Sequence, residues 1–245
     1  MGLGNFENFT LSSRVQKKAP ISTHMDIPKT VSPGHPVFWR NFYETRGPGG
    51  ECEWFVSGQS AADLFVSHVP LDPTSTRLLE VGCGTSNLGL LMRPFVKSVL
   101  AIDICPNAVE ICRGRTTDKG IEYAVADVCR VSDVIPRDSF DVVIDKGTLD
   151  ALLSSDEYHT NGERFIETMG EVVCAGGRLS ILTLNDVSVI MPFIHSCETA
   201  NWEIVVEQAV CLGTRVGKSQ PYQHRGVEII STGSRYTLLV FVKGS

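Results

Sequence analysis

An apolar run that passes directly into a glycine-rich turn constrains the fold of this chain more than any other feature. The run is Leu78–Val81, apolar except for Glu80, and Gly82-Cys83-Gly84-Thr85 follows it. This pattern predicts a short buried strand, a tight turn and a helix. Asp103 lies in the next apolar run, about 20 residues after the first glycine. Glycines let a ligand approach the backbone closely, and a carboxylate at this spacing accepts ribose hydroxyls. The pattern therefore predicts a nucleotide-sugar site.

Two positions near the turn bear on which nucleotide is favoured. The dinucleotide pattern G-x-G-x-x-G has a third glycine for close packing of the strand against the helix, and here that position is Asn87. An acid, Glu80, lies two residues before the first glycine. The stretch E-V-G-C-G-T, residues 80–85, resembles the first motif of class I S-adenosyl-L-methionine (SAM) methyltransferases. The alternatives are an NAD site and an ordinary strand–turn–helix whose glycines serve the turn alone.

The resemblance assigns a part of the cofactor to each strand end. In that family the acid of the first strand helps to position the methionine part of SAM, the glycines face the cofactor, and the acid after the second strand holds the ribose. An acid after the third strand accepts the adenine amino group, and Asp127 matches it here; a helix N-cap is its alternative role. The predicted cofactor-binding residues are Trp54, Glu80, Gly82, Gly84, Asp103, Ile104, Asp127, Val128 and Asp145.

The same resemblance implies the fold class. We expect an α/β chain with a seven-stranded, doubly wound, Rossmann-like sheet that ends in a C-terminal antiparallel strand pair. The helix after the glycine turn should turn Leu88, Leu91, Met92 and Phe95 inward. The other predicted elements are helices near 35–43, 57–68, 160–174 (closed by Gly176-Gly177) and 186–197, and strands at 98–104, 121–125, 139–145, 178–185, 201–212 and 234–242, with a helix starting at Pro106.

Composition narrows the possible partners. The chain has 245 residues, with 42% hydrophobic and 20% charged side chains, as in ordinary soluble proteins. A net charge of −6 argues against broad nucleic-acid binding, and no apolar run is long enough to span a membrane. The eight cysteines form no C-x-x-C pair, so we expect no structural metal site. No nucleic-acid or membrane partner is expected, and no feature indicates an oligomeric state.

The N-terminal part differs in character from the rest. Residues 1–35 carry scattered basic residues and prolines without a sustained period, which predicts a flexible tail. A mitochondrial presequence is the alternative. Residues 36–245 should form a single methyltransferase domain with an N-terminal helical cap. Because no secretory signal is evident, we expect a reducing, cytoplasmic location, with a mitochondrial one as the alternative.

A second informative stretch, residues 139–152, predicts where a substrate binds. It reads as a buried strand that ends in the polar turn Asp145-Lys146-Gly147-Thr148. In doubly wound sheets ligands bind at the carboxyl ends of the strands, so these side chains should face a substrate. The N-P-P-Y and D-P-P-Y motifs of amino-methylating nucleic-acid enzymes do not occur. Lys146 has a plainer alternative, which is to pair with a neighbouring acid.

The turn sequence D-K-G-T-L-D-A-L, residues 145–152, resembles one branch of methyltransferase-like proteins. That branch includes lysine methyltransferases of elongation factor 1 alpha and of mitochondrial citrate synthase, and its aromatic-Trp and Trp-aromatic patterns resemble Phe38-Trp39 and Trp54-Phe55. The resemblance implies a protein substrate, such as elongation factor 1 alpha. We assign catalytic roles to Asp145, which would orient the amine, and to Thr148 and Asp150, which would shape the pocket. Trp54 would wall the cofactor.

Two alternatives to this function remain open from the sequence. The chain could methylate a small molecule, or it could bind SAM without turnover as an interaction protein. The long polar segment between the last two strands, residues 213–233, reads either as a hairpin loop or as a recognition loop at the sheet edge.

Overall fold

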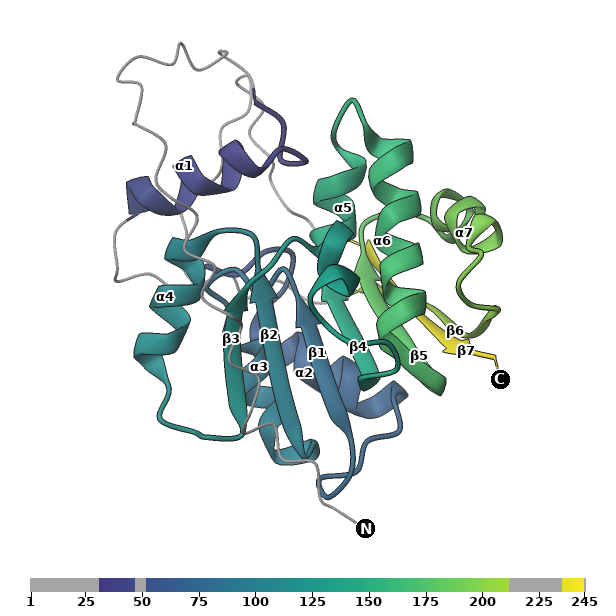
Figure 1. The fold of residues 1–245 in the computed structure, drawn as a ribbon, viewed down its shortest axis with the longest axis horizontal. Coiled ribbons are helices and arrows are strands. Elements are labelled where there is room, and N and C mark those ends of the chain that lie inside the picture. Colours follow the sequence, from purple (N-terminus) through teal and green to yellow (C-terminus); the bar gives the residue numbers. More distant parts are fainter. Residues whose placement is uncertain (1–30, 47–51, 212–234, 245) are drawn as a thin grey trace. The chain divides into compact units, whose positions relative to one another are not determined.

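A computed structural model describes residues 31–46, 52–211 and 235–244. The part from Ser32 onward forms one compact unit. Its centre is a seven-stranded sheet in the order β3-β2-β1-β4-β5-β7-β6 (Figure 1). The strands are β1 (Arg77–Val81), β2 (Ser98–Asp103), β3 (Ile121–Val125), β4 (Phe140–Lys146), β5 (Val173–Thr183), β6 (Trp202–Cys211) and β7 (Arg235–Lys243).

The strand order places the ends of β1 and β4 side by side. Strands β1 to β5 are mutually parallel, and β7 runs antiparallel to both β5 and β6. The predicted seven-stranded α/β sheet with its antiparallel pair is confirmed. The chain order reverses between β1 and β4, where Val81 lies opposite Asp145. A doubly wound sheet binds its ligand at this point of reversal, outside the carboxyl ends of the strands.

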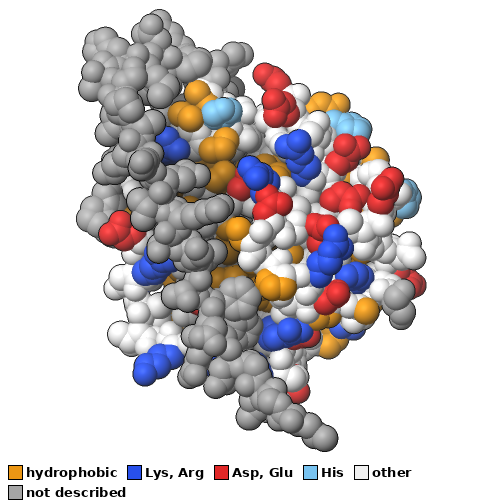
Figure 2. All heavy atoms as spheres, viewed as in Figure 1, with side chains coloured by type: hydrophobic (Ala, Val, Ile, Leu, Met, Phe, Trp, Pro, Cys, Tyr) orange, Lys and Arg blue, Asp and Glu red, His pale blue; other side chains and the backbone are white. Residues whose placement is uncertain are grey.

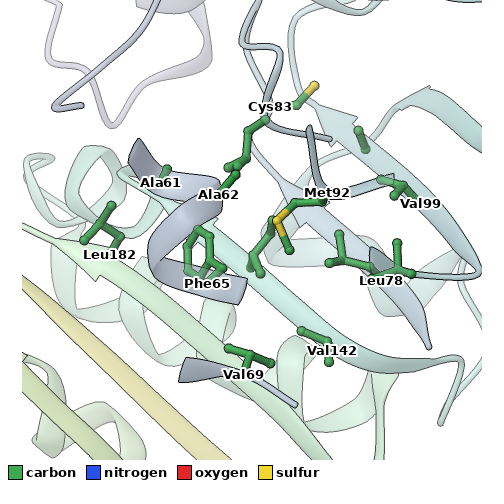
Figure 3. Packing of buried hydrophobic residues seen from close by; sticks show 14 of the residues in the cluster. Ala61, Ala62, Phe65, Val69, Leu78, Cys83, Met92, Val99, Val142 and Leu182 are labelled. Atoms are coloured by element: carbon green, nitrogen blue, oxygen red, sulfur yellow. The ribbon is translucent and has the colours of Figure 1, made fainter. Parts of the chain in front are cut away.

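Helices cover both faces of the sheet (Figure 1). Leu78 on β1 packs into a cluster with α2, α3 and α4, part of which is drawn in Figure 3. Leu79, the next residue, packs on the opposite face with α6 and α7. The helices are α1 (Pro36–Arg46), α2 (Gly58–His68), α3 (Leu88–Met92), α4 (Pro106–Arg115), α5 (Thr148–Leu153), α6 (Tyr158–Val172) and α7 (Val187–Ser196), with 3₁₀ turns η2 (Arg93–Phe95) and η3 (Val128–Asp133). None of the helices in the described ranges is long and apolar enough to cross a membrane.

The glycine pair 176–177 corrects one predicted boundary. We expected these glycines to close the helix, but α6 ends at Val172 and both glycines lie inside β5. The register between β4 and β5 shifts at Phe140/Val142. A Cβ on Gly177 would lie 2.9 Å from the carbonyl oxygen of Asp141. Gly177 therefore serves a close approach of β5 to β4, and neither glycine acts as a helix stop.

Two further expectations differ from the structure around the turns. Phe95 was expected to face inward, but it is 41% exposed because α3 gives way to the 3₁₀ turn η2 at Arg93. The polar turn after β4 contains a short helix, α5, that was not predicted. Two predictions concern residues that the structure does not describe. These are residues 1–30 of the predicted flexible tail and the whole segment 213–233.

Candidate functional site

The glycine turn after β1 has a backbone that other residues adopt only with strain. Gly82 and Gly84 have φ angles of +61° and +53°. A Cβ on Gly82 would lie 1.9 Å from Thr148 Oγ1, and one on Gly84 would lie 2.4 Å from Tyr43 Oη. Thr148 Oγ1 also donates to the carbonyl of Val81 at 3.0 Å. The bare backbone at the end of β1 is therefore required by the fold itself, because Thr148 and Tyr43 pack against it.

Asp103, at the end of β2, is held against this turn. Its Oδ2 accepts the backbone N–H of Gly84 at 2.8 Å, and its Oδ1 accepts that of Cys105 at 2.8 Å. Burial raises the pKa of Asp103, and the two backbone N–H groups oppose the rise. Each carboxylate oxygen can accept more than one hydrogen bond. The predicted ribose acceptor thus lies beside the glycine turn with acceptor capacity left over.

Glu80 lies beneath the turn and is almost fully buried. Its Oε2 faces the first turn of α3, where a Cβ on Gly89 would lie 2.6 Å away, and it has no hydrogen-bond partner. Burial raises the pKa of Glu80 to about 8, and the nearby charge of Lys146 opposes the rise. An unpartnered buried carboxylate oxygen is costly, and a positively charged group of a ligand would stabilise it.

The end of β3 supplies the third predicted contact region. Asp127 Oδ1 accepts the backbone N–H of Cys129 at 2.9 Å and caps the 3₁₀ turn η3. The alternative prediction, that Asp127 acts as an N-cap, is therefore confirmed for η3. The cap engages one oxygen and leaves Oδ2 for an adenine amino group, a role that stays a prediction. Val128 is buried, while Ile104, after β2, is partly exposed.

Helix α1 contributes a residue that the sequence reading missed. Tyr43 is buried, packs with Cys105 and Ala108 at the start of α4, and brings its hydroxyl next to Gly84. Burial and the nearby Asp103 carboxylate raise its pKa, so the hydroxyl stays protonated as a donor. Nothing in the local sequence distinguishes this ring from the other aromatic residues of α1.

Trp54 lies in an aromatic group with α1. Its ring centroid is 5.3 Å from those of Trp39 and Phe42, and its buried Nε1 has no hydrogen-bond partner. The preceding residues tie this segment to the glycine turn: Cys52 N donates to Thr85 Oγ1 at 3.0 Å. Trp54 is thus placed beside the turn, and its role as cofactor wall stays a prediction.

Asp145, at the end of β4, is occupied by the fold. Its Oδ1 and Oδ2 accept the backbone N–H groups of Thr148 at 2.8 Å and Leu149 at 3.2 Å, and the residue is 0% exposed. Burial and the neighbouring carboxylate of Asp150 raise the pKa of Asp145 to about 7. The structure therefore gives Asp145 the task of capping α5, and direct contact with a substrate amine stays a prediction.

Asp150 joins α5 to the end of β5. Its Oδ1 accepts hydrogen bonds from Thr183 Oγ1 at 3.0 Å, from Leu184 N at 2.9 Å and from Asn185 Nδ2 at 3.0 Å. Its Oδ2 is buried and has no partner. Within the described residues neither Asp145 nor Asp150 is paired with Lys or Arg. The two acids therefore lie at the β4–β5 half of the edge without a compensating cation.

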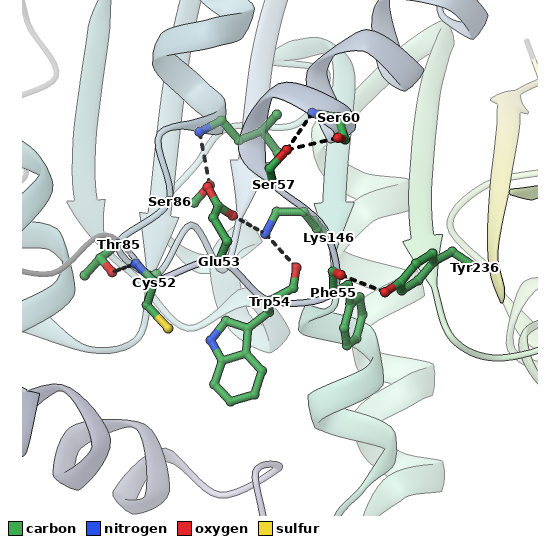
Figure 4. A network of polar contacts seen from close by, with 12 residues as sticks. Cys52, Glu53, Trp54, Phe55, Ser57, Ser60, Thr85, Ser86, Lys146 and Tyr236 are labelled. Carbon is green, nitrogen blue, oxygen red and sulfur yellow. Dashed lines mark hydrogen bonds and ion pairs between the residues drawn. The ribbon is translucent and has the colours of Figure 1, made fainter. Parts of the chain in front are cut away.

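Lys146 takes the structural alternative. Its Nζ donates to Glu53 Oε2 at 2.9 Å and to the carbonyl of Trp54 at 3.2 Å (Figure 4). Its side chain is 7% exposed and that of Glu53 is 17% exposed. Glu53 was not singled out from the sequence, because this contact spans 93 residues. Lys146 therefore fastens the segment before α2 to the end of β4 instead of facing a substrate.

Together, these residues lie along the edge of the sheet where the parallel strands have their carboxyl ends. This edge has two halves. The ends of β1, β2 and β3 carry the glycine turn, Asp103 and Asp127, which fit a nucleoside cofactor such as SAM. The ends of β4 and β5 carry Thr148 and the acid pair. No cluster of three or more potential metal ligands occurs in the described part of the chain. On the face shown in Figure 2, basic and acidic side chains are interspersed and form no single basic patch.

Comparisons with known proteins give one family. Residues 73–228 match a family model described as a methyltransferase domain. The chain is 26% identical to the "eEF1A lysine and N-terminal methyltransferase" of Bos taurus, over 75% of this chain and 26% of that protein. It is 27% identical to a mitochondrial "Citrate synthase-lysine N-methyltransferase" of Danio rerio, over 61% of this chain and 66% of that protein.

The matches differ in how much of each protein they cover. The chain spans about a quarter of the length of the first of these relatives. Among solved structures, it resembles the N-methyltransferase NodS of Bradyrhizobium japonicum in complex with S-adenosyl-L-homocysteine (SAH). The TM-score is 0.60 at 16% identity, over 84% of this chain and 99% of that one, so this likeness concerns the fold.

Proposed function

The chain belongs to the methyltransferase-domain family, with SAM as its cofactor, and from that premise we propose that it methylates a lysine side chain of a protein. Sequence likeness to lysine methyltransferases of two different proteins supports a protein substrate. One structural observation carries the proposal: Asp150 presents an unpartnered buried oxygen at the β4–β5 half of the edge, with no Lys or Arg paired to it in the described residues. A cationic amine is the substrate group that such a site favours.

The chemistry demands little covalent help from the protein. SAM supplies a sulfonium-bound methyl group, and the protein has to align a nucleophile with it and exclude water. A lysine amine has a free pKa near 10.4, so its neutralisation at pH 7 costs about 4–5 kcal/mol. Burial beside a cationic cofactor lowers that pKa, and a carboxylate oxygen orients the remaining N–H groups.

The predicted catalytic residues divide this work between them. Asp150 Oδ2 would accept an N–H of the substrate amine, because its other oxygen is fully engaged. Asp145 would hold α5 and thereby Asp150 in position. Thr148, whose hydroxyl bonds the end of β1, would keep the two halves of the edge in register. These roles are proposals for the three residues that the sequence singled out.

The test is methyl transfer from isotopically labelled SAM into a whole-cell lysate. The purified protein is compared with a Gly82→Arg variant, in which a side chain enters the glycine turn. We expect discrete labelled protein bands with the wild type alone, and mass spectrometry should locate the methyl group on lysine. Purified elongation factor 1 alpha is the first single substrate to test.

Other outcomes would identify the alternatives. Label confined to the small-molecule fraction would indicate a metabolite methyltransferase. Label on a residue other than lysine would overturn the lysine assignment. Absence of all label, with SAH still bound, would indicate an interaction protein without turnover.

A further inference from the structure

The segment Glu53–Phe55 is fastened to the sheet edge by three separate elements (Figure 4). Lys146, from β4, binds the carboxylate of Glu53 and the carbonyl of Trp54. Ser86, from the glycine turn, donates to the other carboxylate oxygen of Glu53 at 2.8 Å. Tyr236, from β7, donates its hydroxyl to the carbonyl of Phe55 at 2.7 Å. The segment thus connects the glycine turn to the end of β4 and to the start of β7.

The backbone of this segment is strained. Phe55 has a φ of +69°, a conformation that is unfavourable for a residue with a bulky side chain. Its ring would lie 2.8 Å from a Cβ on Gly147, so the glycine after Lys146 makes room for it. Strained residues persist where the surrounding structure over-determines them, and they cluster at ligand sites. The contacts of Lys146 and Tyr236 on the carbonyls of Trp54 and Phe55 provide that determination.

The electrostatics make Lys146 the central contact. Glu53 and the buried Glu80 both lie near its ammonium group. Removal of the lysine would leave Glu53 with Ser86 alone and would remove the opposite charge beside Glu80. Breaking a buried ion pair by deleting one partner is strongly destabilising locally, because the other charge remains uncompensated.

We propose that the Lys146–Glu53 ion pair is a positioning clamp for SAM binding: it holds the segment Glu53–Phe55 between the glycine turn after β1 and the turn after β4. The hydrogen bond from Ser86 to Glu53 links the clamp to the glycine turn. Trp54, whose buried Nε1 has no hydrogen-bond partner, is the side chain that the clamp would position as the wall of the cofactor site. Lys146 and Glu53 act through these neighbours, so they are positioning residues. The clamp rests on the cofactor of the proposed function and does not depend on the substrate being lysine.

The test compares two lysines with similar bonding. Lys243 donates to Asp138 Oδ1 at 2.9 Å and to the carbonyl of Val173 at 2.7 Å, at the opposite edge of the sheet. We would titrate Lys146→Met, Lys243→Met and wild-type protein with SAH by calorimetry and by tryptophan fluorescence. We expect Lys146→Met to bind SAH at least about tenfold more weakly and to lose fluorescence change on binding, while Lys243→Met stays within about twofold of the wild type.

A second variant covers the case in which Lys146→Met does not fold. Glu53→Gln can keep the bond from Ser86 and loses only the ionic partner of Lys146, so it should weaken SAH binding in the same way. In the double variant the two losses should be less than additive, because both remove one pair. SAH affinity within about twofold of the wild type for Lys146→Met, or for Glu53→Gln if the former is unfolded, overturns the clamp. Equal losses in Lys243→Met overturn it as well.

The clamp and the proposed lysine methylation fail separately. A protein that transfers no methyl group to lysine still reports on the clamp through SAH titration. Wild-type protein that does not bind SAH would overturn the cofactor assignment and the clamp together.

Discussion

The two edges of the parallel sheet carry the same lysine arrangement in different settings. At the carboxyl edge Lys146 binds Glu53 and a backbone carbonyl, and at the amino edge Lys243 binds Asp138 and a backbone carbonyl. Next to each lysine lies a residue other than glycine with positive φ, Phe55 at +69° and Asp138 at +54°. The bonding pattern is therefore no sign of a ligand site in itself.

Burial and residue type distinguish the two edges. The side chain of Asp138 is 59% exposed, whereas that of Glu53 is 17% exposed. Aspartate visits the left-handed region readily, because its short polar side chain can bond locally, and phenylalanine does not. The carboxyl edge holds a pair with both side chains largely buried and a costly backbone, while the amino edge holds a largely buried lysine paired with an exposed aspartate whose residue type tolerates its backbone. Concentration of strain and buried charge, rather than the ion pair, marks the candidate site.

The largest expected effect comes from substituting two glycines that have positive φ, one at each edge of the sheet. Gly82→Ala places a Cβ 1.9 Å from Thr148 Oγ1, whereas Gly176→Ala, at the amino edge, meets nothing within 4 Å. Both substitutions incur about 1–2 kcal/mol of left-handed backbone strain. Only Gly82→Ala should also displace α5, and we expect SAH affinity to fall by about 100-fold or more. Calorimetric SAH titration and thermal unfolding of both variants provide the measurement; equal SAH affinities would contradict it.

A smaller effect is expected when one aspartate at each edge is replaced by asparagine. Asp150→Asn keeps Oδ1 for its three donors and replaces only the unpartnered Oδ2 by an amide group. We expect kcat/KM for lysine methylation to fall by about 10- to 100-fold, because the amine loses its acceptor. SAH affinity should stay unchanged. Steady-state kinetics with the labelled substrate measure the effect.

Asp138→Asn is the matched control for this prediction. It neutralises an aspartate at the amino edge, and asparagine tolerates the same left-handed backbone. Methylation should be unaffected. If Asp150→Asn turned over like Asp138→Asn, the proposed role of Asp150 would be refuted.

Features encoded close together in the sequence were predictable. Helix α2 is one: the sequence predicted a helix near 57–68, and α2 spans Gly58–His68 with Ser57 as its N-cap. The spacing of Gly82 and Asp103 is another, because one strand–helix–strand unit determines it. The seven-stranded, doubly wound sheet with its antiparallel strand pair followed from the family resemblance.

Features made by distant contacts were not predictable. The Tyr236–Phe55 bond joins residues 181 positions apart, and no local pattern indicates Glu53 as the partner of Lys146. Gly176 and Gly177 were misread because a glycine pair after an apolar helix has the same appearance whether it stops the helix or lets two strands approach. Single-sequence patterns report local geometry, and the clamp depends on tertiary geometry.

The smallest expected effect concerns two aspartates of β4. Asp145, at the carboxyl edge, has its pKa raised by burial to about 7, and Asp141, at the amino edge, has its pKa lowered by the side-chain and backbone N–H groups of Arg77. The contribution of Asp145 to stability is therefore complete below its unfolded pKa of 3.8 and is lost as the pH rises to about 7. That of Asp141 is present above pH 3.8 and is lost as the pH falls below it.

Because the two groups titrate in different ranges, the stability change between pH 5 and pH 8 isolates Asp145 from Asp141. Asp145→Asn should lower the melting temperature at pH 5, since one backbone N–H of α5 loses its acceptor. Between pH 5 and pH 8, however, the melting temperature of the variant should fall by several degrees less than that of the wild type. The conversion is about 2–4 °C for each kcal/mol of stability. Glu80, whose pKa burial raises to about 8, adds a similar slope to both proteins and cancels in the difference. Scanning calorimetry across this range measures the difference. Parallel slopes in both proteins would mean that Asp145 is ionised in the folded state, and its pKa would then not distinguish the carboxyl edge from the amino edge.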